Sequence, residues 1–396
     1  MDHCDGGCLL LAIYPLTEMH AAWDLHLGSD RLGRRLQQLL GESDCSFHCR
    51  RLLRQVMAEA GWPLFAGEVD SDTLFINGQT VDLPVTRLPE ISAGASLLNS
   101  RGDTVAFRLA AGDSHLPEDE EGYLQPPQLP GATCDAVLIR EPWDLLTCND
   151  SALRDDFTPP MEFAELPGVI QIEQRDITVH PEAVVQPGAV LDATAGPVSI
   201  GPRTIIGSLA VIQGPVHIAG DCRIKPHSHI YDATSIGPHC RVGGEIENTI
   251  CHSYVNKQHQ GFVGHSLLMP WTNLGADSNT SDLKNNYSPI RVSRRGELVE
   301  SGQQFLGLLL GDHSKCAINT QFNTGTVGGL FSQIFTPGFP PKELPPFSWG
   351  GGVAGSYRLE DVLEVVERVM SRRQQELTPA LRQLIERLHQ QATSKG

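Results

Sequence analysis

The stretch "SIGPRTIIGSLAVIQGPVHIAGDCRIKPHSHIYDATSIGPHCRVGG", residues 199–244, repeats with a period of six residues. Its aliphatic positions are Ile200, Ile206, Ile212, Ile218, Ile224, Ile230, Ile236 and Val242. The fourth residue after each is small or modest in size for all but the last: Thr204, Ala210, Val216, Cys222, Ser228, Thr234 and Cys240. A period of six fits neither a helix nor a hairpin. It predicts short strands joined at Gly/Pro/Asp corners, wound as a triangular parallel β-solenoid with eighteen residues per coil.

The same period extends toward the N-terminus through Val179, Val185 and Leu191, with a three-residue shift at Gly196-Pro197. Hexapeptides such as "SIGPRTII" are the signature of the left-handed β-helix, an exception to the usual right-handed crossover. We therefore predict an all-β left-handed parallel β-helix, the hexapeptide-repeat class, over residues 166–348.

Residues 1–165 lack the six-residue period and instead show separate strand and helix patterns, which predict an α/β domain. Strands are expected at residues 8–13, 72–78, 104–109 and 135–140. Helices are expected at residues 29–40, with Ser29 as N-cap, and at 49–61, ended by Gly61. The acidic, proline-rich stretch 113–131 reads as a loop. Residues 349–396 predict a tail of two amphipathic helices separated at "LTP".

Composition excludes several classes of protein. A net charge of −17 argues against nucleic-acid binding. No apolar run reaches the eighteen residues that a membrane helix needs, and the acidic start is not typical of a signal peptide, so we expect a cytoplasmic protein. The ten cysteines are too sparse for a disulfide scaffold. Cys4, Cys8, Cys45 and Cys49, with nearby histidines, have spacings that zinc tolerates, but nothing else supports them, and we predict no metal site.

The lysines are concentrated in the second half of the chain. Six lysines stand against twenty-four arginines, and none precedes Lys225. Lys225, Lys257, Lys284, Lys315 and Lys342 then follow. A compact ammonium suits a phosphate as a point charge, so this distribution favours a phosphorylated ligand in the solenoid.

The period breaks after Val242, in "GGEIENTICHSYVNKQHQGFVGHSLLMPWTNLGADSNTSDLKNNY". The order His-x-x-aromatic-x-Gly at 259–264, Asn-Leu-Gly-Ala at 273–276 and Asn-Tyr at 286–287 resembles the acetyltransferase half of the bifunctional N-acetylglucosamine-1-phosphate uridylyltransferase/glucosamine-1-phosphate acetyltransferase. With "GDHSK" at 311–315 and "NTGT" at 323–326, it is still more similar to a bacterial group related to that enzyme. The resemblance covers about residues 165–350.

The resemblance implies a catalytic base at His259, because a neutral imidazole can take a proton from an attacking amine. It implies that Lys225, Lys257, Asn273, Asn286 and Tyr287 bind an amino-sugar phosphate or sugar nucleotide. We assign Lys315 and Asn319 to the co-substrate, acetyl-coenzyme A. The function expected from it is acyl transfer by a homotrimeric enzyme, since one chain offers too few groups to enclose a substrate.

The first domain is expected to be a degenerate nucleotidyltransferase-like domain. It has no lysine and no Gly-rich phosphate loop. His20 and His26 stand where the related group has arginines. Three roles are open for this domain: it catalyses nucleotidyl transfer with Mg²⁺, it binds a nucleotide without catalysis, or it only supports the fold. The alternatives for the whole chain are sugar-1-phosphate nucleotidyl transfer and a non-catalytic sugar-nucleotide scaffold. A hexapeptide carbonic anhydrase ranks below both, because His252, His259 and His265 lack its histidine spacing.

Overall fold

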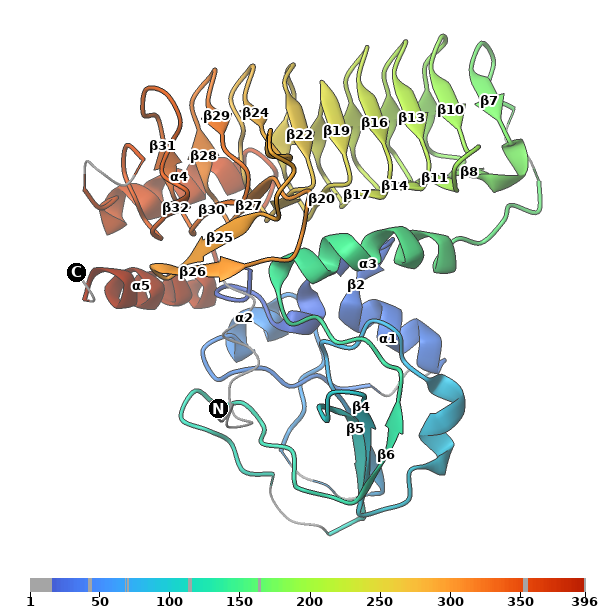
Figure 1. The fold of residues 1–396 in the computed structure, drawn as a ribbon, viewed down its shortest axis with the longest axis vertical. Coiled ribbons are helices and arrows are strands. Elements are labelled where there is room, and N and C mark those ends of the chain that lie inside the picture. Colours follow the sequence, from blue (N-terminus) through green and yellow to red (C-terminus); the bar gives the residue numbers. More distant parts are fainter. Residues whose placement is uncertain are drawn as a thin grey trace.

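The computed structural model describes residues 16–41, 45–67, 69, 71–112, 116–162, 165–351 and 355–394. A long β-solenoid forms one layer, an N-terminal α/β region lies along one side of it, and two C-terminal helices pack at its far end (Figure 1). The predicted fold class is confirmed: a left-handed parallel β-helix preceded by an α/β region and followed by helices.

Three parallel sheets make the walls of the solenoid, and we call them faces A, B and C. Face A consists of β7 (Ile170–Ile172), β10 (Val190–Asp192), β13 (Val211–Gln213), β16 (His229–Tyr231), β19 (Glu245–Glu247) and β22 (Phe262–Gly264), continued by β24 (Asn279–Thr280) and β29 (Gln321–Phe322). Face B consists of β8 (Ile177–Val179), β11 (Val198–Ile200), β14 (Val216–Ile218), β17 (Thr234–Ile236), β20 (Ile250–Cys251), β23 (Leu267–Leu268), β27 (Leu308–Leu310), β30 (Thr326–Gly328) and β32 (Glu343–Leu344). Face C consists of β9 (Val184–Val185), β12 (Ile205–Ile206), β15 (Arg223–Ile224), β18 (Arg241–Val242) and β21 (Asn256–Lys257), continued by β28 (Lys315–Cys316) and β31 (Gln333–Ile334).

The six-residue period places one aliphatic side chain per face inside the prism. All eight of the periodic aliphatics from Ile200 to Val242 are at most 2% exposed. The small residues four positions later lie at the corners, and Thr204, Ala210 and Cys222 are completely buried there. The register confirms the repeat: Ile200 pairs with Ile218, and Ile218 pairs with Ile236, one coil further on.

One insertion interrupts the later coils. Residues 281–307 leave the solenoid between β24 on face A and β27 on face B. They form an extended segment and an antiparallel hairpin of β25 (Arg291–Arg294) and β26 (Glu297–Glu300), which the hexad pattern did not predict.

The N-terminal region is built around a four-stranded sheet of order β3-β5-β4-β6. Its elements are η2 (Ala22–Asp24), β1 (His26–Leu27), β2 (Asp30–Arg31), α1 (Leu32–Leu40), α2 (Arg54–Glu59), β3 (Thr73–Ile76), η3 (Val85–Glu90), β4 (Ala95–Asn99), β5 (Thr104–Leu109), β6 (Gly131–Cys134) and α3 (Pro142–Asp155). A short helix, η4 (Gln174–Asp176), connects the first two solenoid strands.

Three local predictions for this region need comment. The strand expected at 135–140 is wrong, because β6 ends at Cys134 and only Leu138 makes an isolated bridge, to Thr80. Ser29 is not a helix cap: it lies in the turn of the β1–β2 hairpin, and α1 begins after Arg31. The strand expected at 8–13 lies outside the described residues.

The N-terminal region covers face B. Leu25, Leu27 and Trp143 share one apolar cluster with Ile250 and Leu309 of that face. Asn149 of α3, fully buried, donates to the Ala233 carbonyl (2.6 Å) and accepts from the Gly28 amide (2.8 Å). Hydrogen bonds and apolar burial therefore join the two parts.

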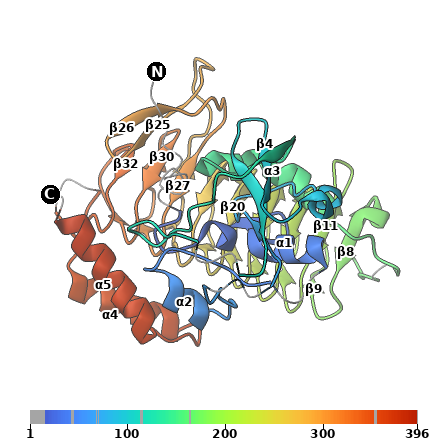
Figure 2. The same cartoon turned by 90° about the horizontal axis from the view of Figure 1, so that it is seen from below.

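The C-terminal helices cover the edge between faces B and C, which we call the B/C edge. The helices are α4 (Leu359–Ser371) and α5 (Pro379–Thr393), as predicted, with Thr378 as N-cap of the second. Aromatic rings of successive coils stack along this edge, in the order His239, Tyr254, Trp271, His313, Phe331 and Phe347. Phe347 contacts His389 of α5, and Figure 2 shows both helices alongside this end of the solenoid.

Candidate functional site

The edge between faces C and A, here the C/A edge, stays open to solvent. It consists of the turns that follow the strands of face C, namely residues 207–210, 225–228, 243–244, 258–261, 275–278 and 317–320. Successive turns stack because their backbone amides bond to the next coil, as the Lys225 amide does to the Val242 carbonyl and the Gly243 amide to the Lys257 carbonyl. Lys225, His259 and Asn319 are all exposed on this edge.

Gly243 separates Lys225 from the turn that carries His259. A Cβ atom at Gly243 would lie 2.4 Å from the backbone oxygen of Gln258 and 3.1 Å from the Cβ of Lys225. The glycine therefore lets two coils approach and leaves the space between the lysine and the histidine free of a side chain. Two coil spacings put Lys225 about 10 Å from the Gln258–His259 turn.

Asn273 and Lys315 lie beside this edge on the outer side of face C. Asn256, Asn273 and Lys315 occupy the same position in three successive coils. The Nδ2 of Asn256 donates to the Oδ1 of Asn273 at 2.5 Å. The ammonium of Lys315 donates to the His313 carbonyl (2.8 Å), and burial lowers its pKa to about 8. The column therefore offers amide groups beside the C/A edge, whereas the ammonium of Lys315 is directed to His313 on the B/C edge.

Lys257 does not line this surface, which corrects its prediction as a substrate-binding residue. It pairs in register with the core residue Val242, so its side chain points into the prism and is only 2% exposed. Its Nζ donates to the carbonyls of Gly243 (2.9 Å) and His259 (2.5 Å). Burial lowers the pKa of this lysine to about 8. Lys257 therefore holds the turn of His259 from inside.

Asn286 and Tyr287 lie elsewhere in the chain. Both are exposed in the 281–307 insertion, which leaves from the edge between faces A and B, the other margin of face A. The Oδ1 of Asn286 accepts hydrogen bonds from Ser288, and Tyr287 accepts one from Gln304 through its carbonyl. A single chain therefore places Lys225, His259, Asn273 and Asn319 along or beside the C/A edge, but directs the ammonium of Lys315 to the B/C edge and carries Asn286 and Tyr287 at a third edge.

The three histidines considered for a carbonic anhydrase are also distributed over different edges. His252 is buried on the B/C edge, His259 is exposed on the C/A edge, and His265 follows β22 at the margin between faces A and B. His265 pairs with Asp282 at 2.8 Å and stacks on Phe305. These three do not form a shared site within the chain.

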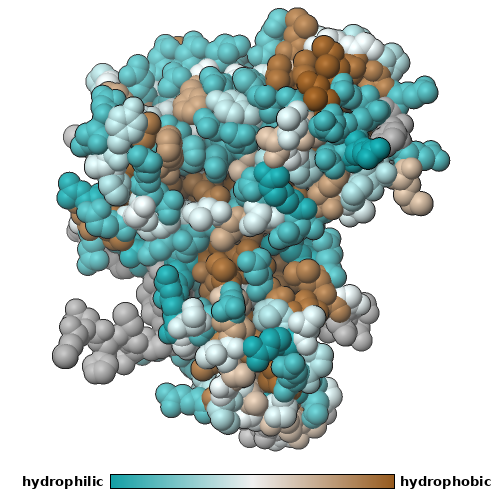
Figure 3. Space-filling view, turned by 45° about the vertical axis from the view of Figure 1, so that its right-hand side comes forward, coloured by the Kyte–Doolittle hydropathy of each residue, from teal (hydrophilic) through white to brown (hydrophobic). Residues whose placement is uncertain are grey.

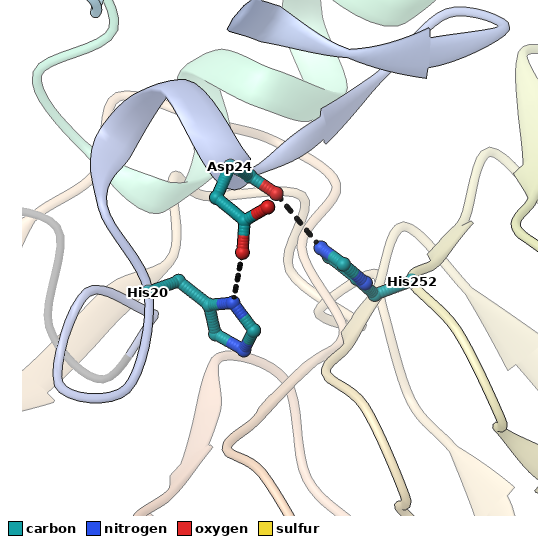
Figure 4. A group of neighbouring side chains, drawn as sticks. All are labelled: His20, Asp24 and His252. Atoms are coloured by element: carbon teal, nitrogen blue, oxygen red, sulfur yellow. Dashed lines mark hydrogen bonds and ion pairs between the residues drawn. The ribbon is translucent and has the colours of Figure 1, made fainter. Parts of the chain in front are cut away.

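A second group of chemical interest lies between the N-terminal region and the solenoid. His20 and Asp24 come from the N-terminal region and His252 from the solenoid (Figure 4). His20 bonds through Nδ1 to Asp24 (2.6 Å) and through Nε2 to Asp312 of the solenoid (2.8 Å). These two carboxylates outweigh burial and raise the pKa of His20 to about 10, whereas burial lowers the pKa of His252 to about 3.

Sequence reasoning singled out His20 and His252 but did not connect them. They are 232 positions apart, and only the docking of the N-terminal region on face B brings them together. Of the cysteines considered for zinc, Cys4 and Cys8 lie outside the described residues, and His48, next to Cys49, contacts Glu118 and Arg54.

The cavities of the N-terminal region bear on the nucleotidyl-transfer alternative. One cavity of about 90 Å³ is lined by His20, His48, Arg50 and Tyr123, among others, and is too small for a nucleoside triphosphate. A larger cavity of about 410 Å³ lies between this region and the solenoid, lined by residues that include His26, Ser29, Arg31, Arg34 and His252.

In the part of the chain that the structure describes, no helix is long and apolar enough to cross a membrane.

Comparison with known proteins gives one family match and several relatives. Residues 9–159 match the family model described as "Sugar nucleotidyl transferase". The "Uncharacterized acetyltransferase YaiX" of Escherichia coli O6:K15:H31 is 26% identical over 212 residues, which are 53% of this chain and 87% of that protein. The "Bifunctional protein GlmU" of Methanocaldococcus jannaschii is 24% identical over 191 residues, 48% of this chain and 41% of GlmU. The "Bifunctional sugar-1-phosphate nucleotidylyltransferase/acetyltransferase" of Sulfurisphaera tokodaii is 27% identical over 112 residues, 28% of this chain and 27% of that protein.

Proposed function

We propose that this chain, a relative of the GlmU proteins with a sugar nucleotidyl transferase region, is an acetyl-coenzyme A-dependent acyltransferase that acts on an amino-sugar phosphate or a sugar nucleotide. The observation that carries the proposal is the C/A edge. Stacking of the coils gathers on one solvent-open edge a lysine, an imidazole and amides drawn from almost a hundred residues of sequence. The acetyltransferase names of the relatives support the same reaction class.

The arrangement forms a linear track with distinct ends. Lys225 lies at one end and Asn319 four coils further along, which corresponds to about 19 Å at the usual spacing of strands. His259 lies between them. This order suits an extended pair of reactants, with the acceptor phosphate at Lys225 and the acyl donor beside Asn319.

His259 acts as the general base. It takes a proton from the acceptor amine as the nitrogen attacks the thioester carbonyl. The carbon–sulfur bond then breaks, and the thiolate leaves as coenzyme A after it gains a proton. Asn273 donates to sugar hydroxyls, and Lys225 neutralises the phosphate. Lys257 holds the His259 backbone in place from inside the prism and does not contact the substrate.

A second copy of the chain completes the site in this proposal. Asn286 and Tyr287 extend from the other margin of face A, so a neighbouring subunit in a trimer can present them to His259. The exposed apolar residues Ile170, Ile172, Val184 and Leu209 on the early coils give a surface for such association, and Figure 3 shows apolar residues gathered on the solenoid part.

The test measures acetyl transfer from acetyl-coenzyme A to glucosamine 1-phosphate, with release of the coenzyme A thiol as the signal. His259→Ala should lower the rate by about 10²–10⁴-fold without unfolding the protein, the usual contribution of a positioned base. His180→Ala, an exposed histidine on the B/C edge, is the matched control and should keep full rate. Full activity of a folded His259→Ala protein would refute the assignment of the base.

Mixing of two inactive proteins tests the shared site. His259→Ala and Asn286→Ala chains, unfolded together and refolded as mixed trimers, should regain part of the activity that each lacks alone. No recovery in a verified mixed trimer would show that both residues act within one chain, and a stable monomer by light scattering would remove the shared site altogether.

Sugar-1-phosphate nucleotidyl transfer is the second candidate, favoured by the family match of residues 9–159. The region has no lysine, and the cavity lined by His20, His48 and Tyr123 has a volume of only about 90 Å³. We therefore expect no pyrophosphate release from a nucleoside triphosphate, a sugar 1-phosphate and Mg²⁺. Metal-dependent release above background would establish this activity.

A further inference from the structure

We propose that His20, Asp24 and His252 form a binding site for a divalent transition metal such as Zn²⁺ at the joint between the N-terminal region and the solenoid. Each offers one ligand atom, and the three atoms lie within 4.8 Å of one another (Figure 4). Two imidazole nitrogens and one carboxylate oxygen are the ligands that Zn²⁺ prefers, whereas Mg²⁺ and Ca²⁺ prefer oxygen alone.

Asp24 is already oriented as a metal ligand would be. Its Oδ1 accepts hydrogen bonds from Arg31 (2.7 Å) and from the indole of Trp62 (3.1 Å). Its Oδ2 is thereby turned toward Nδ1 of His20, at 2.6 Å. A metal ion would replace the proton shared by these two atoms, and they would separate by about 0.7 Å to coordinate it tetrahedrally.

His20 has the partner that metal-bound histidines usually have. Its other nitrogen, Nε2, lies 2.8 Å from Oδ1 of Asp312. A carboxylate in that position fixes the tautomer of a histidine ligand and makes it more basic. His252 supplies the third ligand through Nε2, which now lies 2.9 Å from the backbone oxygen of Asp24. Coordination of the ion through this nitrogen would replace its hydrogen bond to the Asp24 carbonyl.

Charge and unsatisfied atoms point to a cation at this place. Two buried carboxylates, Asp24 and Asp312, face one guanidinium, that of Arg31, so the joint requires a further positive charge. Either a proton on His20 or a metal ion can supply it. Among the described residues, the buried Oδ2 of Asp312 and Nε2 of His26 have no hydrogen-bond partner, as is common where an ion or water belongs.

One of the three ligands borders a cavity. His252 and Arg31 line the cavity of about 410 Å³ between the two parts of the molecule, whereas His20 and Asp24 are not among its lining residues. A fourth ligand, which zinc needs for tetrahedral coordination, would therefore approach from the side of His252.

The experiment uses the full-length protein, first stripped with a chelator and then titrated with Co²⁺ and Zn²⁺. Co²⁺ should give the visible absorption bands of a four-coordinate ion, and Zn²⁺ should displace it at one ion per chain. Absence of these bands in the folded wild-type protein would refute the proposal without any variant.

Variants then locate the site. Asp24→Asn and His252→Ala should each weaken Zn²⁺ binding by at least about 100-fold. Asp312→Asn, which changes the partner of His20 and not a ligand, should weaken it by about 10–100-fold. His229→Ala, a histidine on face A that bonds to Gln213, is the control and should bind like the wild type. Unchanged Co²⁺ bands in His252→Ala would place the ion elsewhere and overturn the assignment.

Discussion

Lys257→Met should change how the stability of this protein depends on pH. The amine lies in the inner column of the solenoid, where every neighbouring coil places an apolar side chain or a cysteine, and only the carbonyls of Gly243 and His259 solvate it. Burial lowers its pKa from 10.5 to about 8. At about 1.4 kcal/mol per pKa unit, the charged form costs about 3 kcal/mol of folding free energy.

The direction of the effect follows from proton binding. Between pH 8 and 10.5 the unfolded chain holds the lysine proton and the folded chain releases it. The unfolded state therefore binds more protons, and the contribution of Lys257 to the free energy of unfolding becomes more favourable as the pH rises. Below pH 8 the amine is charged in both states and its cost is constant.

The measurement is urea denaturation of wild type and Lys257→Met at several pH values from 7 to 10. The stability of the wild type relative to the variant should rise by about 2.5 kcal/mol over this range. Buried thiols outside the solenoid, such as Cys49, whose pKa burial raises to about 12, titrate in both proteins and cancel in the difference. Gln258→Met on the adjacent residue is the non-titrating control. A difference that does not vary with pH would show that the amine reaches solvent, and the inward assignment would be wrong.

Three further perturbations test the fold and the open edge. Gly243→Ala should displace the Gln258 backbone, which would lie 2.4 Å from the new Cβ, and acyl transfer should fall while the circular dichroism spectrum stays that of a β-protein. Asn149→Ala should destabilise the protein by about 2–4 kcal/mol in thermal or urea denaturation, because it leaves buried partners of both regions unsatisfied. Ile218→Asp should abolish folding, since it buries an unpaired carboxylate inside a coil, whereas Arg223→Asp at an exposed position nearby should be tolerated; soluble, folded Ile218→Asp protein would contradict the core assignment.

The sequence alone determined the solenoid, because its structure is local and repetitive. Each coil needs one apolar residue per face and one small residue per corner. The series from Ile200 to Val242 meets this requirement with local residues alone. The same locality placed Lys225, His259, Asn273 and Asn319 near one another, since residues at equivalent positions of successive coils stack at a known spacing. The tail helices were predictable for a similar reason, from their amphipathic period and the Thr378-Pro379 start.

Tertiary structure decided what local periodicity cannot express. Lys257 occupies an inward position although it is charged, because the strand register, and not polarity, directs its side chain. Asn286 and Tyr287 follow the insertion and leave the edge of His259. The joint of His20, Asp24, His252 and Asp312 depends on the docking of the N-terminal region on the solenoid. No spacing in the chain encodes that contact, because it forms only when the apolar faces of both parts are buried together.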